Sequence, residues 1–338
     1  MKPCGEHKIL ALPNMRTLKK CSVLTGLRRY SRTVKEGSLV LALALSMPIA
    51  ATAADTAETF ATPEEAVSAL VRATTAESGE ALRSIFGPAA ADLENPDRVQ
   101  ATNEFNKFNA ALGATNLLVH ESDTKCVLVV GTNSWPFPVP IVKKDGRWFF
   151  DTAAGKEEIF LRRIGKNELA TLDVMRAYVD AQREYASRDR NGDEVLEYAQ
   201  RLASTPGAKD GLFWPPDLDG ELSPLGPMVA QARGEGYGMQ RKDQDTTREP
   251  FHGYFFKILT CQGKHAPGGK YNYVINGHMI GGFALVAWPA EYRESGIMTF
   301  IVNQQGRVYQ RDLGAKTDKL AAAMKAYDPD TSWARSAD

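Results

Sequence analysis

The chain has 338 residues, 43% of them hydrophobic, and a formal net charge of zero from 41 Lys/Arg and 41 Asp/Glu. The length allows two domains, and the composition is that of an ordinary globular protein. Residues 1–53 hold nine Lys/Arg and two Asp/Glu, which leaves 32 basic and 39 acidic residues, a net charge of −7, for residues 54–338. That sign disfavours a protein that binds phosphate backbones, so we predict no nucleic-acid partner.

The first 53 residues have the pattern of a secretory signal peptide. A basic region, Arg28 to Lys35, precedes the apolar run from Leu39 to Ala50, and the small residues Ala51-Thr-Ala-Ala54 follow. This order of charged region, short apolar region and small-residue cleavage site is typical of exported proteins. Because Pro48 interrupts the run and a bilayer requires ~20 apolar residues, a membrane anchor is disfavoured.

Cleavage is predicted to make Ala54 or Asp55 the first residue of the mature protein. The product is then exported, periplasmic or secreted, and has no membrane span after cleavage. Because the leader is unusually long, the start codon at Met1 and one at Met15 both remain open.

Residues 54–158 are predicted to form a first domain of helices packed on an antiparallel sheet. Thr62-Pro-Glu-Glu65 has a capping hydroxyl, a proline suited to the first turn and two acids at the positive end of the helix dipole. Apolar residues at helical spacing predict three helices before Gly113. Strands follow at Asn116–His120 and Cys126–Val130, and a hairpin turns at Asp145-Gly146. This order resembles nuclear transport factor 2-like or cystatin-like architectures.

Residues 159–338 are predicted to form a second α+β domain, because the apolar period changes between Gly155 and Ile164. A long helix from Ile164 buries Leu169 and Leu172, and a shorter helix follows over residues 195–202. Residues 205–250 form a long loop with one short helix at Ser223-Pro224. Five strand-like segments then predict an antiparallel meander: His252–Cys261, Tyr271–Ile275, Gly282–Trp288, Ile297–Val302 and Arg307–Arg311. A last helix spans Asp318–Tyr327.

No catalytic, cofactor or metal site is predicted from the spacing of the polar residues. The histidines that remain after export, His120, His252, His265 and His278, share no helix turn and no paired motif. The segment Asp189-Arg-Asn-Gly-Asp193 lacks the glycine and the glutamate that an EF-hand needs at Glu194 and Gln200, so a plain turn is predicted.

Aromatic residues beside prolines are the candidate binding residues. Trp135, Phe137, Phe213 and Trp214 lie in segments that prolines keep out of central strands. Large aromatics on rigid loops are common anchors for a partner. The alternative is that these side chains fold back to cover the two sheets.

Two cysteines remain in the mature chain, Cys126 and Cys261. They pair if their Cα atoms lie within roughly 7 Å of one another. Otherwise each is a small buried apolar residue in its own sheet.

Several stretches resemble a bacterial family of exported proteins, domain of unknown function 2950. They are Phe60–Ala66, Trp135–Pro140, Gly146–Asp151, Arg162–Glu168, His252–Phe256 and the strands from Gly282 to Tyr309. The resemblance covers most of the mature chain and implies no activity. The long helix followed by a meander also resembles the head of type IV pilins and pseudopilins.

Two functions follow as hypotheses. The first is a non-enzymatic exported protein that binds another protein or an envelope ligand through its loops, without a cofactor. The second is a hydrolase with a site between the domains, built from carboxylates and one of His252, His265 or His278.

Overall fold

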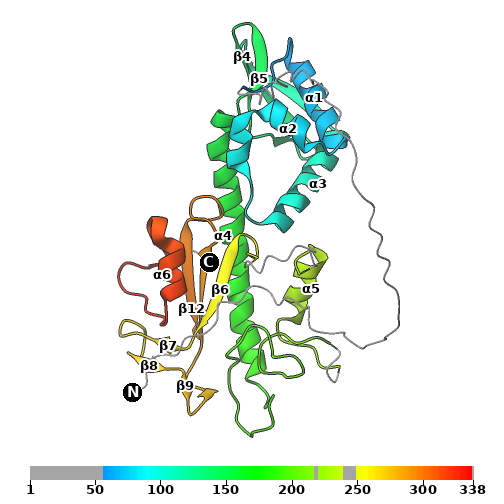
Figure 1. Ribbon diagram of the computed structural model, residues 1–338. Helices are drawn as coiled ribbons and strands as arrows, with labels where there is room; N and C mark the ends of the chain where they lie inside the picture. Colours follow the sequence, from blue (N-terminus) through cyan, green and yellow to red (C-terminus); the bar gives the residue numbers. More distant parts are fainter. Residues whose placement is uncertain (1–55, 217–219, 239–248, 337–338) are drawn as a thin grey trace, which may run out of the picture.

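The fold is described from a computed structural model, which places residues 56–216, 220–238 and 249–336. The predicted signal peptide and its cleavage site at Ala54 or Asp55 lie outside the described residues. Two antiparallel sheets, each with its own helices, are joined by one long helix, α4 (Thr152–Tyr185) (Figure 1). The predicted α+β class is therefore confirmed.

The three α-helices of the first unit, α1 (Pro63–Thr75), α2 (Gly79–Phe86) and α3 (Arg98–Ala114), begin at capping side chains. A short 3₁₀ helix, η1 (Pro88–Leu93), lies between α2 and α3 and has no side-chain cap. The Thr62 hydroxyl accepts a hydrogen bond from Glu65 N at 3.2 Å, as the sequence predicts. Ser78 caps α2, and the Asp97 carboxylate caps α3 by accepting from Gln100 N at 2.9 Å. Each cap satisfies an amide that has no partner within its helix.

The first sheet has the strand order β1-β2-β4-β5, with β3 paired to β2. Its strands are β1 (Asn116–Ser122), β2 (Lys125–Val130), β3 (Trp135–Pro136), β4 (Ile141–Lys144) and β5 (Arg147–Phe150). The helices cover one face, and the core between them includes Leu70, Ile85, Cys126, Leu128 and Ile141. On the other face Leu117 and Val119 are 63% and 42% exposed, which an antiparallel sheet tolerates. The predicted turn at Asp145-Gly146 joins β4 to β5.

Helix α4 begins earlier than the sequence predicts. The Asp151 carboxylate accepts from Ala154 N at 3.0 Å, and the helix then continues for 34 residues, about 51 Å. The predicted boundary at residues 158–159 therefore falls inside α4. Leu169, predicted to be buried, is 66% exposed, whereas Asn167 and Thr171 are fully buried, so Leu169 lies on the opposite side of the helix from them.

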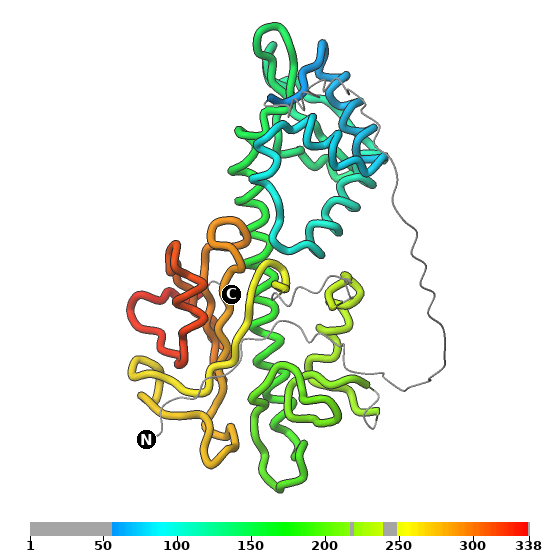
Figure 2. The backbone as a smooth tube through the Cα atoms, viewed as in Figure 1, coloured from blue at the N-terminus to red at the C-terminus, as the bar shows by residue number. Residues whose placement is uncertain are grey.

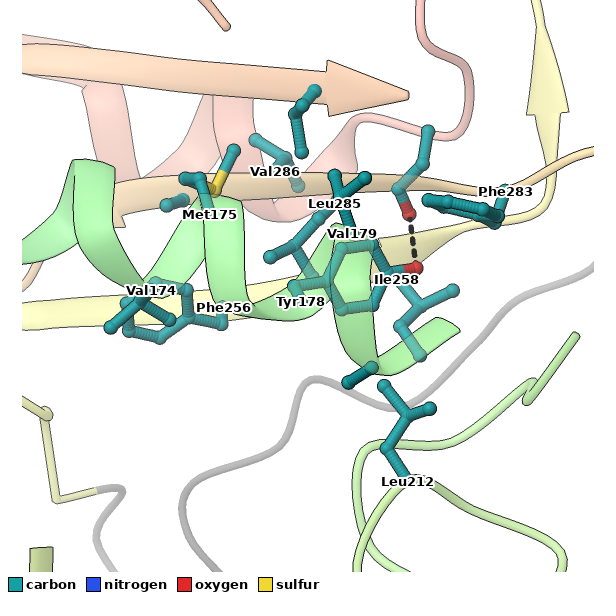
Figure 3. Close-up of a cluster of buried hydrophobic side chains, with 14 of the residues drawn as sticks. Val174, Met175, Tyr178, Val179, Leu212, Phe256, Ile258, Phe283, Leu285 and Val286 are labelled. Atoms are coloured by element: carbon teal, nitrogen blue, oxygen red, sulfur yellow. Dashed lines mark hydrogen bonds between the residues drawn. The ribbon is translucent and has the colours of Figure 1, made fainter. Parts of the chain in front are cut away.

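The C-terminal half of α4 packs into the core of the second unit. Met175, Tyr178 and Val179 point toward the side chains of the neighbouring sheet (Figure 3). The Tyr178 hydroxyl donates to the carbonyl oxygen of Ala284 at 3.2 Å, which satisfies a buried polar group. This contact joins the helix to the backbone of an inner strand of the second sheet.

The second sheet has the order β14-β13-β12-β11-β6, and all pairs are antiparallel. Its strands are β6 (Tyr254–Leu259), β11 (Ala284–Pro289), β12 (Met298–Asn303), β13 (Tyr309–Asp312) and β14 (Ala334–Arg335). The predicted meander is confirmed for β6, β11, β12 and β13. Both α4 and α6 (Thr317–Ala323) contact β11, and every residue of β11 is buried. The 3₁₀ helix η2 (Gly314–Lys316) precedes α6.

The shorter helix predicted over residues 195–202 is wrong, because this segment has no helical turns. Its backbone bonds to other segments: Tyr198 N donates to Met279 O at 2.9 Å, and Phe213 N donates to Leu202 O at 2.9 Å. Ala199 N donates to the Gln182 side chain at 2.8 Å. These long-range partners replace the bonds that a helix would have formed with its own residues.

Short elements complete the second unit. They are α5 (Gly226–Gly234), inside the predicted loop 205–250, and the strand pairs β7 (Cys261–Gln262) with β8 (Tyr271–Asn272) and β9 (Val274–Ile275) with β10 (His278–Met279). Figure 2 shows the backbone between β6 and β11 at the end of the second unit that is remote from the first. None of the helices in the described part of the chain is long and apolar enough to cross a membrane.

Two glycines of α4 predict opposite effects of the same substitution. A Cβ on buried Gly155 would lie 2.8 Å from Val139 Cα, whereas one on exposed Gly165 would have no atom within 4 Å. We expect Gly165→Ala to raise the free energy of unfolding by roughly 0.5–1 kcal/mol through helix propensity. Gly155→Ala should lower it by roughly 1–3 kcal/mol through overpacking. Urea denaturation measures both, and equal shifts would contradict the close approach of α4 to Val139.

Candidate functional site

The structure separates the four predicted aromatic residues into two pairs. Phe213 and Trp214 are 6% and 1% exposed and belong to the core of the second unit. They therefore cover a sheet, as the alternative interpretation predicts. Trp135 is 41% exposed, and with half-buried Phe137 it lies at the surface of the first unit.

Trp135 and Phe137 line a groove of about 520 Å³ between α3 and α4. Its walls come from both helices, and the proline-rich segment after β2 forms its floor. Apolar residues predominate in the lining, among them Phe105, Phe108, Trp135, Phe137 and Ile159. Volumes of this order hold small-molecule ligands in proteins.

The aromatic floor is fixed by ring contacts. The ring of Phe137 stacks on that of Phe108 with a centroid distance of 5.1 Å and an interplanar angle of 24°. Trp135 meets Phe137 and Phe108 edge-on at 6.3 and 6.4 Å. Behind them Phe137 contacts Phe150 of the core at 6.2 Å. These rings are held before any ligand arrives, so little side-chain entropy is lost on binding.

The rim of the groove is mainly cationic. The Arg162 guanidinium lies 5.1 Å from the centre of the Trp135 ring, and its Nη1 donates to Pro136 O at 2.8 Å. Lys166 forms an ion pair with Glu104 at 2.6 Å that links α4 to α3. Lys107 is exposed and forms no ion pair with any residue that the structure describes. The groove therefore has cations at its opening, where an anionic group can bind, and an aromatic surface in its interior.

Arg162 and Arg163 are adjacent in the sequence, and the structure gives their side chains different partners. Both residues line the groove, but Arg162 lies over the Trp135 ring, while buried Arg163 donates to the carbonyls of Leu93 and Glu94 at 2.6 and 3.0 Å. Burial lowers the pKa of Arg163, which nevertheless stays charged at neutral pH. The sequence does contain a signal for this cationic rim. Arg162 and Lys166 are four residues apart, and that spacing places both side chains on one side of a helix.

A second polar cluster joins the two units at Asp97. Its buried carboxylate accepts from the Tyr237 hydroxyl at 2.6 Å and from Gly253 N at 3.1 Å, besides capping α3. Burial raises the pKa of Asp97 despite these donors. The pKa of Asp97 is therefore higher in the folded state than in the unfolded state. Its contribution to stability is fully present below pH ~3.9, the unfolded-state pKa, and is lost as the pH rises through the folded-state pKa.

The Asp97 cluster continues into further buried contacts. The Gln100 amide donates to the Asn167 side chain at 2.7 Å, and the Asn167 amide donates to Ser295 O at 2.8 Å. His252 Nε2 lies 3.3 Å from a carboxylate oxygen of Glu235. Burial lowers the pKa of His252, although the neighbouring carboxylates oppose that shift. This cluster fastens the first unit to the second.

The other histidines and the cysteines lie apart from the groove and the junction. His120 lies beside Cys126, with Nδ1 3.2 Å from Sγ, and His265 Nδ1 lies 3.2 Å from a carboxylate oxygen of Asp328. His278 faces two carboxylates at the far end of the second unit. Cys126 is a free, buried cysteine of the first sheet, so it forms no bridge to Cys261 in β7.

Comparison with known proteins finds a matching family model. The model of the family described as "Protein of unknown function (DUF2950)" matches residues 57–336. No curated protein and no solved structure matches the chain. The likeness to a pilin head stays a prediction.

The contacts between the two units predict that losing a buried tyrosine hydroxyl lowers stability more than losing an exposed one, although both hydroxyls donate to an aspartate carboxylate. Tyr237→Phe should lower the free energy of unfolding by roughly 1.5–3 kcal/mol, because a buried carboxylate loses a donor. Tyr292→Phe is the matched control: Tyr292 donates to exposed Asp312 at 3.1 Å, and its loss should change stability by less than about 0.5 kcal/mol. Denaturation of both variants at pH 7 tests this, and similar losses would show that Asp97 does not hold the junction.

Proposed function

The chain belongs to the DUF2950 family, and from that premise we propose that it is an exported, non-enzymatic protein that binds an amphipathic anion in the groove between α3 and α4. A fatty acid or a similar apolar acid from the envelope is the class of ligand that fits this chemistry. The apolar part lies on the aromatic floor, and the acid group meets the cationic rim.

The observation that carries the proposal is the combination of exposed Trp135 with charges at the same opening. A tryptophan that is 41% exposed leaves apolar surface in water, and covering it is favourable at roughly 25 cal/mol per Å². Lys107 has no carboxylate partner among the described residues, so an incoming anion displaces no ion pair there. Arg162 is held over the ring by Pro136 O and Glu158, which orients its remaining donors.

The pattern of residues 1–53 supports export. A basic region, an apolar run and a small-residue cleavage site occur in the order that signal peptidase substrates share. The remaining chain carries a net charge of −7, so the cationic rim is local and not part of a generally basic surface. Attraction of anions would therefore concentrate at the groove.

A hydrolase with a site at the junction is the second candidate. Its support is the pair of His252 and Glu235 at 3.3 Å, half-buried between the units. Asp97, the nearby buried carboxylate, accepts bonds from a cap amide, a hydroxyl and a second amide, which is the arrangement of a structural group. Hydrolysis of a p-nitrophenyl ester that disappears in His252→Gln would favour this candidate over binding alone.

The groove predicts a specific pattern of ligand affinities. Calorimetry of the mature chain should detect binding of dodecanoate that is stronger than binding of dodecanol, which has the same apolar chain without the charge. Trp135→Ala should weaken dodecanoate binding about tenfold, the effect of losing roughly 1.4 kcal/mol of apolar contact. Lys107→Gln should weaken it about two- to fivefold and reduce its dependence on salt.

Leu196→Ala is the control for nonspecific apolar binding, since Leu196 is 59% exposed and lies in the second unit. It should leave the affinity for dodecanoate unchanged. Equal affinity for dodecanol and dodecanoate, or loss of binding in Leu196→Ala to the same extent as in Trp135→Ala, would contradict the groove as the site.

Export predicts the N-terminus of the mature protein. Protein recovered from the exported fraction should begin at Ala54 or Asp55, because Ala51-Thr-Ala53 supplies the small residues before the cut. N-terminal sequencing measures this directly. A mature product that retains residues before Leu39 would rule out the predicted cleavage.

A further inference from the structure

Three potential ligand groups meet beyond the C-terminal end of α4, in the second unit. Asp193 and Glu197 lie on the irregular segment after this helix, and His278 lies on β10. One atom from each side chain lies within 4.8 Å of the other two. His278 Nδ1 is 3.4 Å from Asp193 Oδ2 and 3.4 Å from Glu197 Oε2.

The imidazole nitrogen in this cluster lacks the hydrogen bond that burial normally requires. His278 Nδ1 is inaccessible to solvent and has no hydrogen-bond partner, although two carboxylate oxygens are near it. The nitrogen is equally distant from the two oxygens and bonds to neither. Two carboxylates that converge on a buried nitrogen also repel each other, and a cation between the three groups offsets that repulsion.

The spacing of these atoms matches a small metal ion. A tetrahedral ion with bonds of about 2.0–2.2 Å to nitrogen and oxygen places neighbouring ligand atoms roughly 3.3–3.6 Å apart. Both distances from Nδ1 are 3.4 Å and lie in this range. A hydrogen-bonded ion pair is shorter, commonly about 2.7–2.9 Å between nitrogen and oxygen.

Hydrogen bonds from outside the cluster hold the carboxylates in place. The Asn191 amide donates to Asp193 Oδ2 at 2.7 Å and to Glu197 Oε1 at 3.1 Å. Backbone amides add bonds, from Val195 N to Asp193 Oδ1 at 2.9 Å and from Met279 N to Glu197 Oε2 at 3.2 Å. Such outer bonds orient metal ligands in known sites and tune their affinity.

A tight hairpin presents His278. Strands β9 and β10 are joined by Asn276-Gly277, both at positive φ of 52° and 95°, as a two-residue hairpin turn requires. The Gln200 side chain donates to Gly277 O at 2.6 Å, which ties the hairpin to the segment that carries Glu197. The three groups are therefore brought together without an ion.

We propose that Asp193, Glu197 and His278 bind one divalent first-row transition ion, of which zinc is the representative. The imidazole nitrogen disfavours calcium and magnesium, which prefer oxygen ligands. The side chains of Asp193 and His278 are 34% and 32% exposed, so water completes the coordination. The sequence predicts no metal site, because 81 residues separate Glu197 from His278 and no spacing motif links them.

Titration of the EDTA-treated mature chain with zinc chloride, followed by calorimetry, tests the site. One equivalent should bind, and the midpoint of thermal unfolding should rise with zinc concentration. His278→Ala and Glu197→Gln should each weaken zinc binding by at least tenfold. Cobalt should show the visible absorption of a low-symmetry site in the wild type and lose it in both variants, while calcium at equal concentration should not displace zinc.

His265→Ala is the matched control, since His265 faces one carboxylate, that of Asp328, at 3.2 Å. It should bind zinc as the wild type does. Thermal unfolding in EDTA shows whether each variant is folded, and Glu197→Gln preserves the side-chain shape if His278→Ala disturbs the hairpin. Absence of stoichiometric binding, or equal weakening by His265→Ala and Glu197→Gln, would overturn the proposal.

Discussion

Helix α4 is the constraint on which the arrangement of this protein depends. One helix of 34 residues contributes to both units, so the first sheet and the second are tied to a single rigid axis. The helix is not the only connection between the units: Asp97 and Asn167 form buried hydrogen bonds across the junction. Buried polar groups are costly unless every partner is present, and the junction therefore favours one relative placement.

The two proposed sites lie near opposite ends of α4. Near its start, close approach of α4 at Gly155 brings Arg162 beside the proline-rich segment and leaves a groove against α3. Beyond its end, the chain turns back and is fixed to the hairpin of His278 through backbone and amide bonds. The first site offers cations and rings, and the second offers carboxylates and an imidazole, so a ligand of one does not suit the other.

Burial determines which of the four candidate aromatic residues can contact a ligand. Phe213 and Trp214 have the same sequence character as Trp135 and Phe137, yet they lie in a core. Phe213 N and Trp214 Nε1 bond to Leu202 O and Glu221 O, which draws that loop inward against α4. Trp135 instead lies on the short strand β3, which pairs with β2, and its ring stays at the surface.

Local patterns in the sequence determined the helix caps, the hairpin at Asp145-Gly146, the strands of the meander and the α+β class, because each depends on residues close together in the chain. The start of α4 was missed because Asp151 as a cap gives a weaker local signal than the apolar period that begins near Ile164. The sequence also marked Trp135 and Phe137. Only the tertiary structure decided that Arg162 lies over Trp135, that Asp97 joins the units, and that His278 meets Asp193 and Glu197. These contacts join residues up to 156 positions apart, and their energy depends on burial and distance that no local pattern encodes.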